Sequence, residues 1–203
     1  MNETLFVRHG ETTWNATGRI QGWAPVPLSD RGRRQADSVA AAVIEGRQSV
    51  DAVVSSDLPR APATAEPVAE AAGVEVETDR RLRERDFGAY QGLDAEGFFD
   101  RFPEMDLLNE STDAAAYTPE SGESWLDVRE RVLAAATELR DRDERTVVVT
   151  HRNPVLLVIG EARGLDLVDA LTDGSAANCS ITRIDADGRV THATETGHLD
   201  RER

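Results

Sequence analysis

The residues of this 203-residue chain best suited to chemistry are Arg8, His9, Gly10 and Glu11, which follow its first apolar run. Residues 5–7 have the pattern of a short buried strand, and the polar cluster begins where that strand should end. An arginine, an imidazole and a glycine at a strand end can hold a phosphate and attack it. Taken alone, however, the cluster is better explained as a strand terminus with a salt-bridged arginine.

A second histidine, His151, follows another apolar run at residues 147–150. Open α/β sheets place their ligands outside the carboxyl ends of their strands. If both runs are strands of one sheet, His9 and His151 lie at the same edge of it. The pair predicts a site with two imidazoles.

Strand-like runs alternate with amphipathic helical segments along the chain. The expected strands are residues 5–7, 53–55, 74–76, 147–150, 180–184 and 189–194, and the expected helices are 29–45, 59–72, 124–140 and 154–163. Residues 10–28 and 79–120 should be mostly irregular, with a short helix near 93–101. This order predicts an α/β fold, a three-layer αβα sandwich whose mostly parallel central sheet gains an antiparallel edge strand from the hairpin at 180–194.

Prolines and capping residues predict where the helices begin and end. Pro59 suits the first turn of its helix, and Pro67 should kink that helix. Asn153 can cap the helix that Pro154 opens, with Gly164 as its stop.

Composition favours one domain over residues 1–203, because no linker-like stretch divides the chain. No apolar stretch has the length of a membrane span, and no leader pattern precedes the first strand. The single cysteine, Cys179, forbids an internal disulfide, suits a reducing cytoplasm and should pack in the core.

The net charge is −15, and all 23 basic residues are arginine. Such acidity excludes general binding to nucleic acid, whose phosphates would be repelled. It also means that an anionic substrate must be captured by a local arginine cluster, whose forked donors bind phosphate bidentately. A salt-rich, halophile-like cytoplasm would screen the self-repulsion.

Several motifs, taken in order, resemble those of the histidine phosphatase superfamily, which contains the cofactor-dependent phosphoglycerate mutases. The matching segments are residues 8–12 with Asn15, 21–22, 28–29 with Gly32, 35–36, 55–61 with 64–65, 82–88 with Gly92, 119–124 and 149–151. The resemblance spans about residues 4 to 160. It implies a phosphoglycerate mutase-like fold.

The resemblance implies a role for each residue of the site. His9 would be the nucleophile that carries the phosphoryl group, and Arg8 and Arg60 would clamp the phosphoryl oxygens. His151 would donate to the same group, and Glu84 would be the general acid and base. The substrate-binding set is Asn15, Gln21, Gly22 and Arg152. The scheme needs neither a metal nor a cofactor.

The chain departs from the family pattern after the second histidine. Arg152, Asn153, Pro154 and Val155 stand where a pair of glycines and a later arginine are common. Arg152 then either points into the pocket, where it would select a second anionic group, or points to solvent. Gln91 also replaces an acidic residue.

Other polar and aromatic residues have plainer interpretations. Glu11 is expected to be structural. The expected surface groups are Arg80, Arg81, Arg83, Arg85, His192 and His198, although one of these arginines could reach substrate. Trp14 and Trp23 either cover the pocket mouth or pack under the loop.

These observations predict a phosphatase that hydrolyses small-molecule phosphate monoesters through a phosphohistidine. The first alternative is a phosphoglycerate mutase, and a third is a non-catalytic module that binds a phosphorylated ligand. The expected partner is a small phosphorylated metabolite, not nucleic acid or a membrane. Its identity stays open, as does the oligomeric state, for which a homodimer is one option.

The acidic composition generates a first prediction. Raising KCl from about 0.1 to about 1 M shortens the Debye length from about 10 to about 3 Å, which screens repulsion among surface carboxylates. We expect the free energy of unfolding to rise, measured as a higher urea midpoint at constant pH. A midpoint that falls or stays constant with added KCl would contradict the salt-adapted interpretation.

Overall fold

The computed structural model describes residues 3–45 and 49–199. A six-stranded sheet runs through its centre in the order β3-β2-β4-β1-β5-β6. The strands are β1 (Glu3–Arg8), β2 (Ala52–Ser55), β3 (Val76–Thr78), β4 (Thr146–Thr150), β5 (Ile181–Asp185) and β6 (Val190–Glu195). β1, β2, β3 and β4 are parallel, whereas β5 pairs antiparallel with both β1 and β6.

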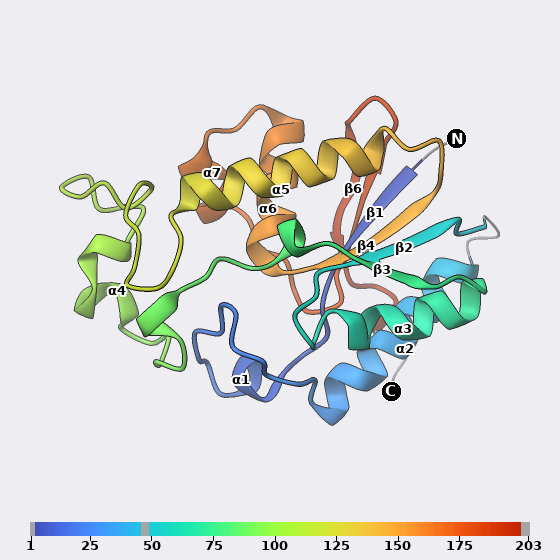
Figure 1. Cartoon of the computed structure of the whole chain (residues 1–203), viewed down its shortest axis with the longest axis horizontal. Coiled ribbons are helices and arrows are strands. Elements are labelled where there is room, and N and C mark those ends of the chain that lie inside the picture. The colour runs from blue at the N-terminus through green and yellow to red at the C-terminus, as the bar shows by residue number, and fades with distance from the viewer. Residues whose placement is uncertain (1–2, 46–48, 200–203) are drawn as a thin grey trace.

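Helices cover both faces of the sheet, and Figure 1 shows α5 and α6 on one side and α2 and α3 on the other. The helices are α1 (Thr13–Ala16), α2 (Asp30–Glu45), α3 (Pro62–Ala72), α4 (Phe98–Arg101), α5 (Trp125–Arg140), α6 (Arg152–Arg163) and α7 (Leu167–Thr172). Short 3₁₀ turns lie at Arg80–Leu82, Gly88–Tyr90 and Pro103–Met105. The predicted αβα sandwich is confirmed.

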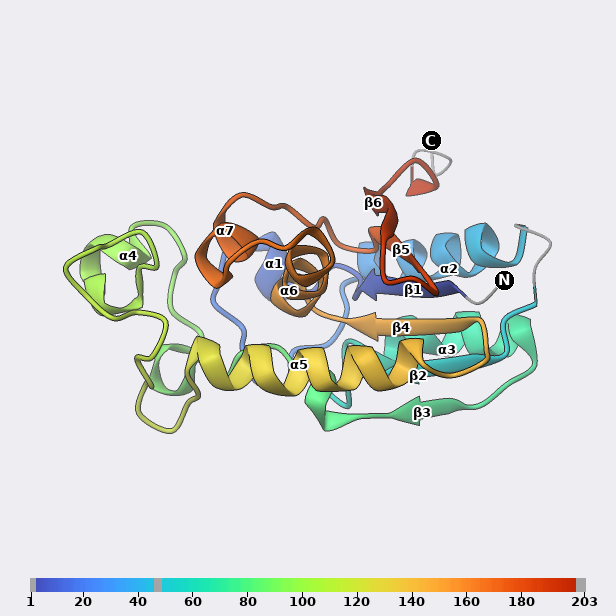
Figure 2. The ribbon, with the colours of Figure 1, turned by 90° about the horizontal axis from the view of Figure 1, so that it is seen from above.

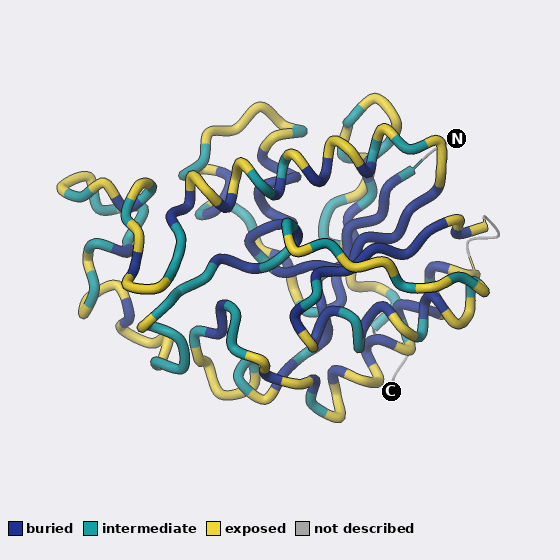
Figure 3. The backbone as a smooth tube through the Cα atoms, viewed as in Figure 1, coloured by how far each residue is buried: buried dark blue, intermediate teal, exposed yellow. Residues whose placement is uncertain are grey.

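Alternation along the strands builds two cores. In β1, Phe6 packs with α5 and α6, whereas its neighbours Leu5 and Val7 pack with α2 and α3. In β4, Val148 faces the first core and Val147 and Val149 the second. The three central strands β1, β2 and β4 are therefore buried on both sides (Figure 3), as expected of a parallel sheet between helical layers. Cys179 packs in the second core, as predicted.

The sequence misplaced two helix starts. α3 begins at Pro62 rather than Pro59, because either proline suits a first helical position and the chain forms a turn over 59–61 first. α6 begins at Arg152 with His151 as its N-cap, so Asn153 does not cap it. Pro154 is tolerated in the first turn, where backbone N–H groups have no helical acceptor.

Smaller differences lie in the connections. The strand predicted at 74–76 is displaced to β3, and the loop at 10–28 contains α1, which Thr12 and Asn15 cap reciprocally. α7 has no counterpart among the helices predicted from the sequence. The segment around α4 stands beyond the N-terminal end of α5, away from the sheet (Figures 1 and 2). Within the described ranges, no helix combines the length and apolar character needed to cross a membrane.

Candidate active site

Three parallel strands deliver polar residues to one edge of the sheet. Arg8 at the end of β1 lies opposite Thr150 at the end of β4, and Ser55 ends β2 beside Val149. The next residues of β1 and β4 are the two histidines, whose ring centroids are 5.1 Å apart. The backbone N–H of His9 donates to the Thr150 carbonyl (2.9 Å). The hydrogen bonding between β1 and β4 therefore extends to His9 and fixes the position of its backbone. The predicted convergence is present.

Hydrogen bonds define the tautomer of His9. Its Nδ1 lies 2.7 Å from the carbonyl oxygen of Gly10, which can only accept, so Nδ1 carries the hydrogen. Nε2 then has a free lone pair, and it accepts from Nε of Arg60 at 3.2 Å. Burial, reinforced by Arg60 and Arg8, holds the pKa of His9 well below its ordinary value of 6.5. The ring is therefore neutral at neutral pH, with the lone pair of Nε2 unprotonated.

The ring of His151 lies next to that of His9 and is fully buried. Its Nε2 lies 2.8 Å from the hydroxyl oxygen of Ser56, the residue that follows β2. Nδ1 has no hydrogen-bond partner within the described part of the chain. Burial, the charge of Arg60 and the neighbouring His9 hold the pKa of His151 well below 6.5. Among the described residues, a buried imidazole nitrogen thus lies without a partner beside His9, although His151 itself is not one of those that line the cavity described below.

Two guanidinium groups flank the nucleophile without an acidic partner on their hydrogen bonds. Arg60, 1% exposed, donates to the carbonyls of Ala24 (3.1 Å) and Gly22 (2.7 Å) as well as to His9. Nη1 of Arg8 donates to the Ala176 carbonyl (2.7 Å). Burial lowers the pKa of each to about 10. Both remain cationic at neutral pH, so the pocket is locally positive within an acidic protein.

The carboxyl of Glu84 lies at the N-terminal end of α6, where it meets Asn153. Its Oε1 accepts from the side-chain amide of Asn153 (2.9 Å) and the backbone of Arg85 (2.9 Å), and Oε2 faces the backbone N–H of Asn153 (3.4 Å). A carboxyl suits a helix N-terminus, where backbone N–H groups point outward. The sequence pattern missed this partner of Glu84, because Asn153 stands where the family has a glycine and was assigned to capping.

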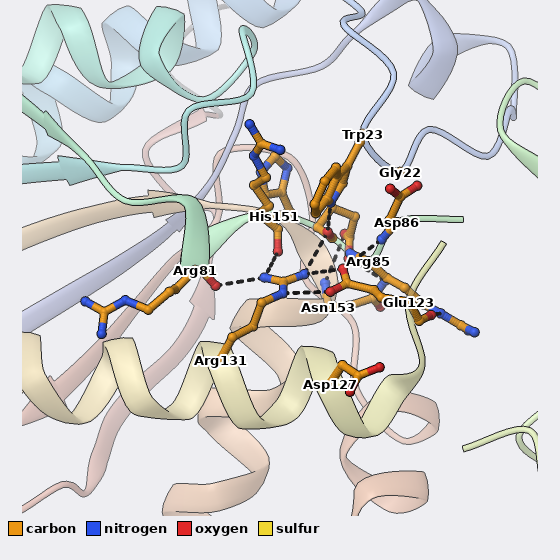
Figure 4. Close-up of polar contacts among 12 residues, drawn as sticks. Gly22, Trp23, Arg81, Arg85, Asp86, Glu123, Asp127, Arg131, His151 and Asn153 are labelled. Carbon is orange, nitrogen blue, oxygen red and sulfur yellow. Dashed lines mark hydrogen bonds and ion pairs between the residues drawn. The ribbon is translucent and has the colours of Figure 1, made fainter. Parts of the chain in front are cut away.

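Arg131 of α5 holds the segment that carries Glu84 (Figure 4). Its guanidinium donates to the carbonyls of Arg81, Arg83 and Glu84 at 2.7–2.9 Å. The carboxylate of Glu123 pairs with the same group through two hydrogen bonds, at 2.9 and 2.6 Å. Both terminal nitrogens of Arg131 thus fix the backbone of residues 81–84, while Nε binds Glu123, and no local sequence signal predicts these contacts.

A cavity of about 620 Å³ is lined by Arg8, His9, Arg60 and Glu84. All four residues expected to bind substrate line it: Asn15, Gln21, Gly22 and Arg152. Arg152 thus lies in the cavity wall, where it donates to Asn153 and the Gly174 carbonyl at 3.3 Å. Asn178 was not anticipated, yet its amide bonds both the His9 carbonyl (3.0 Å) and the side chain of Asn15 (3.2 Å).

Several residues differ from their expected roles. Arg85 is not a surface group: it is fully buried, lines the cavity and lies 4.5 Å from the centre of the Trp125 ring. Neither Trp14 nor Trp23 is among the lining residues. Gln91 acquires a role, since its side chain accepts from the backbone of Ala24 (2.8 Å) and donates to Gly88 (3.2 Å).

The remaining arginines and histidines mostly follow expectation. Arg81 and Arg83 form ion pairs with Asp79 and Asp57. Glu11 is structural, accepting from Ser29 and Arg31 at the start of α2. His192 is exposed, whereas His198 is half-buried against the Cys179 carbonyl. Among residues 3–45 and 49–199, no group of three His, Cys, Asp or Glu side chains has the arrangement of a metal site.

Comparison with known proteins identifies the relatives of this chain. Residues 4–197 match the histidine phosphatase superfamily (branch 1). The phosphoglycerate mutase-like protein 4 of Arabidopsis thaliana is 37% identical, with 97% of this chain and 89% of that protein covered. A mycobacterial glucosyl-3-phosphoglycerate phosphatase superposes with a TM-score of 0.76 at 28% identity, with 96% and 99% covered.

A third relative is the Entamoeba histolytica phosphoserine phosphatase, solved in complex with 3-phosphoglyceric acid. It superposes with a TM-score of 0.80 at 25% identity, covering 98% of this chain and all of that one (100%). The relatives thus include proteins named as phosphatases and as mutase-like proteins.

The two depressed imidazole pKa values predict how stability depends on pH. Below pH 6.5 the unfolded chain protonates both histidines while the folded chain does not, so the free energy of unfolding falls as pH falls. Each imidazole contributes a slope of up to about 1.4 kcal/mol per pH unit. In urea titrations between pH 6.5 and 5.5, His9→Asn or His151→Asn should each remove about that much slope. An unchanged slope in both variants would contradict the assignment.

Proposed function

The chain belongs to the histidine phosphatase superfamily, and we propose that it hydrolyses small-molecule phosphate monoesters through a phosphohistidine at His9. One observation carries the proposal: the unprotonated Nε2 of His9 faces the guanidinium of Arg60 in a cavity wall that Arg8 shares. A neutral nucleophile beside two fixed cations is what phosphoryl transfer requires, because charge spreads over the phosphoryl oxygens during the reaction.

In the first step Nε2 of His9 attacks phosphorus, forming an N–P bond as the P–O bond to the alcohol breaks. Nε of Arg60 then moves its hydrogen bond from the nitrogen lone pair to a phosphoryl oxygen. Arg8 and Nδ1 of His151 supply further donors. Nδ1 of His9 keeps its hydrogen and donates it to the Gly10 carbonyl. This hydrogen bond stabilises the positive charge that develops on the ring.

Glu84 completes the cycle. In its protonated form it gives a proton to the leaving oxygen, and it then accepts one from the water that attacks the phosphohistidine. The second step breaks the N–P bond, releases inorganic phosphate and restores neutral His9. Asn153 and Arg131 position Glu84. Asn153 binds its carboxyl, and Arg131 binds its backbone carbonyl.

A phosphoglycerate mutase is the second candidate, favoured by the names of sequence relatives. A mutase shares the phosphohistidine but returns the phosphoryl group to a bound product. The names of two structural relatives, a glucosyl-3-phosphoglycerate phosphatase and a phosphoserine phosphatase, favour transfer to water. Phosphate release measured against the interconversion of 2- and 3-phosphoglycerate, on the same preparation, separates the two reactions.

We infer in addition that the protein works in the cytoplasm on a small phosphorylated metabolite. The buried single cysteine suits a reducing compartment, and the acidic surface disfavours nucleic acid.

The phosphohistidine generates a direct prediction. Incubation with a labelled phosphodonor such as ³²P-acetyl phosphate should place an acid-labile, base-stable label on the wild type. His9→Ala should carry none and lose at least about 10³-fold in kcat, since the covalent route is removed. Label that persists in His9→Ala would exclude this residue as the nucleophile. Absence of label and of turnover in the wild type would favour a non-catalytic binding module.

The role of Glu84 predicts a dependence on the leaving group. Glu84→Gln should slow alkyl phosphates, which need a proton on the departing oxygen, about 10²-fold or more, and 4-nitrophenyl phosphate far less. Asn153→Ala should show the same selectivity with smaller effect, about tenfold, because the carboxyl stays but loses a hydrogen bond. The measurement is kcat/KM for both esters. Equal slowing of both substrates would remove Glu84 from the acid role.

A further inference from the structure

The cavity is much larger than its phosphate end requires. Its volume of about 620 Å³ lies in the range of pockets that enclose drug-sized ligands. Its lining runs from the end of β1 and the first turn of α6 to α4, which Figures 1 and 2 place well away from the sheet. The remainder of the cavity must therefore accommodate the part of the ester that carries no reacting atom.

That remainder is walled by apolar side chains. One segment contributes most of them: Phe87, Phe98, Phe99, Met105, Leu107 and Leu108. Trp125 at the start of α5 and Leu171 of α7 extend the wall. Three separate elements thus present apolar surface to one cavity.

The wall combines a rigid base with exposed tips. Phe98 is buried and packs edge-on against Tyr90 at 5.6 Å between centroids, and it contacts Phe102 at 5.1 Å. By contrast, Phe99 is 53% exposed and Leu108 is 67% exposed, although both line the cavity. A ligand that covers large apolar side chains exposed beside a binding site removes their surface from water, which lowers the free energy of the complex.

Charge at this end does not suit a second anion. Asp106 lies in the wall between Met105 and Leu107. The guanidinium of Arg85 is engaged by the carbonyls of Glu123 (3.0 Å) and Tyr117 (3.1 Å) and stacks on Trp125. Arg19 and Arg152 also line the cavity, where they donate to the carbonyls of Gly92 (3.2 Å) and Gly174 (3.3 Å). The part of the wall formed by residues 98–108 is chiefly apolar, with Asp106 as its one charged lining residue.

We propose that the substrate is an amphipathic phosphate monoester, whose phosphate binds at His9 and whose alkyl or aryl body packs on this apolar wall. The inference rests on the proposed phosphatase function and names its substrate class. A compact polyanion such as a phosphoglycerate would leave the wall wet. An ester with an apolar body would bury Leu108 and Phe99.

A homologous series of esters tests the proposal. n-Butyl, n-hexyl and n-octyl phosphate have nearly equal leaving groups, so differences in kcat/KM report the body rather than the chemistry. Each methylene buried on the wall should raise kcat/KM by up to about fourfold. 3-Phosphoglycerate should be a poorer substrate than hexyl phosphate.

A matched pair of variants locates the effect. Leu108→Gln should flatten the rise with chain length, because it should lower kcat/KM for octyl phosphate far more than for butyl phosphate. Leu126→Gln replaces a leucine of α5 that is 50% exposed and not among the lining residues, so it should retain the full rise. Both side chains are exposed, and neither substitution opens a cavity in the core.

Three results would overturn the inference. The first is a flat series in a wild type that still hydrolyses butyl phosphate in a His9-dependent manner, which leaves the phosphatase function intact. The second is an equal effect of both variants on the series. The third is a dimer in analytical ultracentrifugation that Leu108→Gln dissociates, which would assign the apolar tips to a second copy of the chain. If no ester turns over and His9 takes no label, the proposed function itself fails.

Discussion

Two cationic guanidinium groups are buried beside two neutral imidazoles, and the rest of the site is arranged around that charge. For Arg60 the fall in pKa from 12.5 to about 10 corresponds to roughly 3 kcal/mol against keeping the charge in the pocket. Backbone carbonyls of Gly22 and Ala24 offset part of this without neutralising it. A carboxylate partner would stabilise the arginine more strongly, but it would also cancel the field that an arriving phosphate needs. Burial, reinforced by the same field, keeps His9 unprotonated, so the arrangement that suits an anion also leaves the lone pair of Nε2 available.

Close backbone packing makes this arrangement possible. Gly10 follows the nucleophile and lies against Gly32 of α2, so closely that a Cβ on either residue would overlap backbone atoms of the opposite segment. Thr64 of α3 accepts from the Gly10 N–H (3.0 Å) and donates to the Arg60 carbonyl (2.8 Å). The Thr64 hydroxyl thereby links the loop that follows His9 to the turn that carries Arg60. The helices on this face of the sheet contribute to the site through such contacts as well as through the core.

The phosphate-facing half of the site was predictable from sequence because it depends on strand ends. Apolar runs at 5–7 and 147–150 locate two strands, and a polar residue after each must lie at the sheet edge if the strands are parallel neighbours. The contacts that orient those residues were not predictable. Asn153 and Glu84 are 69 positions apart, and Arg131 reaches backbone carbonyls that every residue possesses. Local patterns report propensity and period, whereas these pairings arise only when separate elements pack.

Arg152 and Asn153, which stand where the family resemblance implies a pair of glycines, line one end of the cavity, and this end differs from the other. Asn153 binds the carboxyl of Glu84 from α6, while Arg131 binds its backbone from α5, so the proton donor is held from two layers at once. Side chains at this corner thus add fixed polar contacts where the reaction occurs. At the other end the wall is made by a segment that stands apart from the sheet and keeps Phe99 and Leu108 in water. Under the proposed function, such a site would fix the position of phosphorus at its polar end. It would leave the choice of alcohol to hydrophobic contact, where one methylene is worth only about 1–3 kcal/mol.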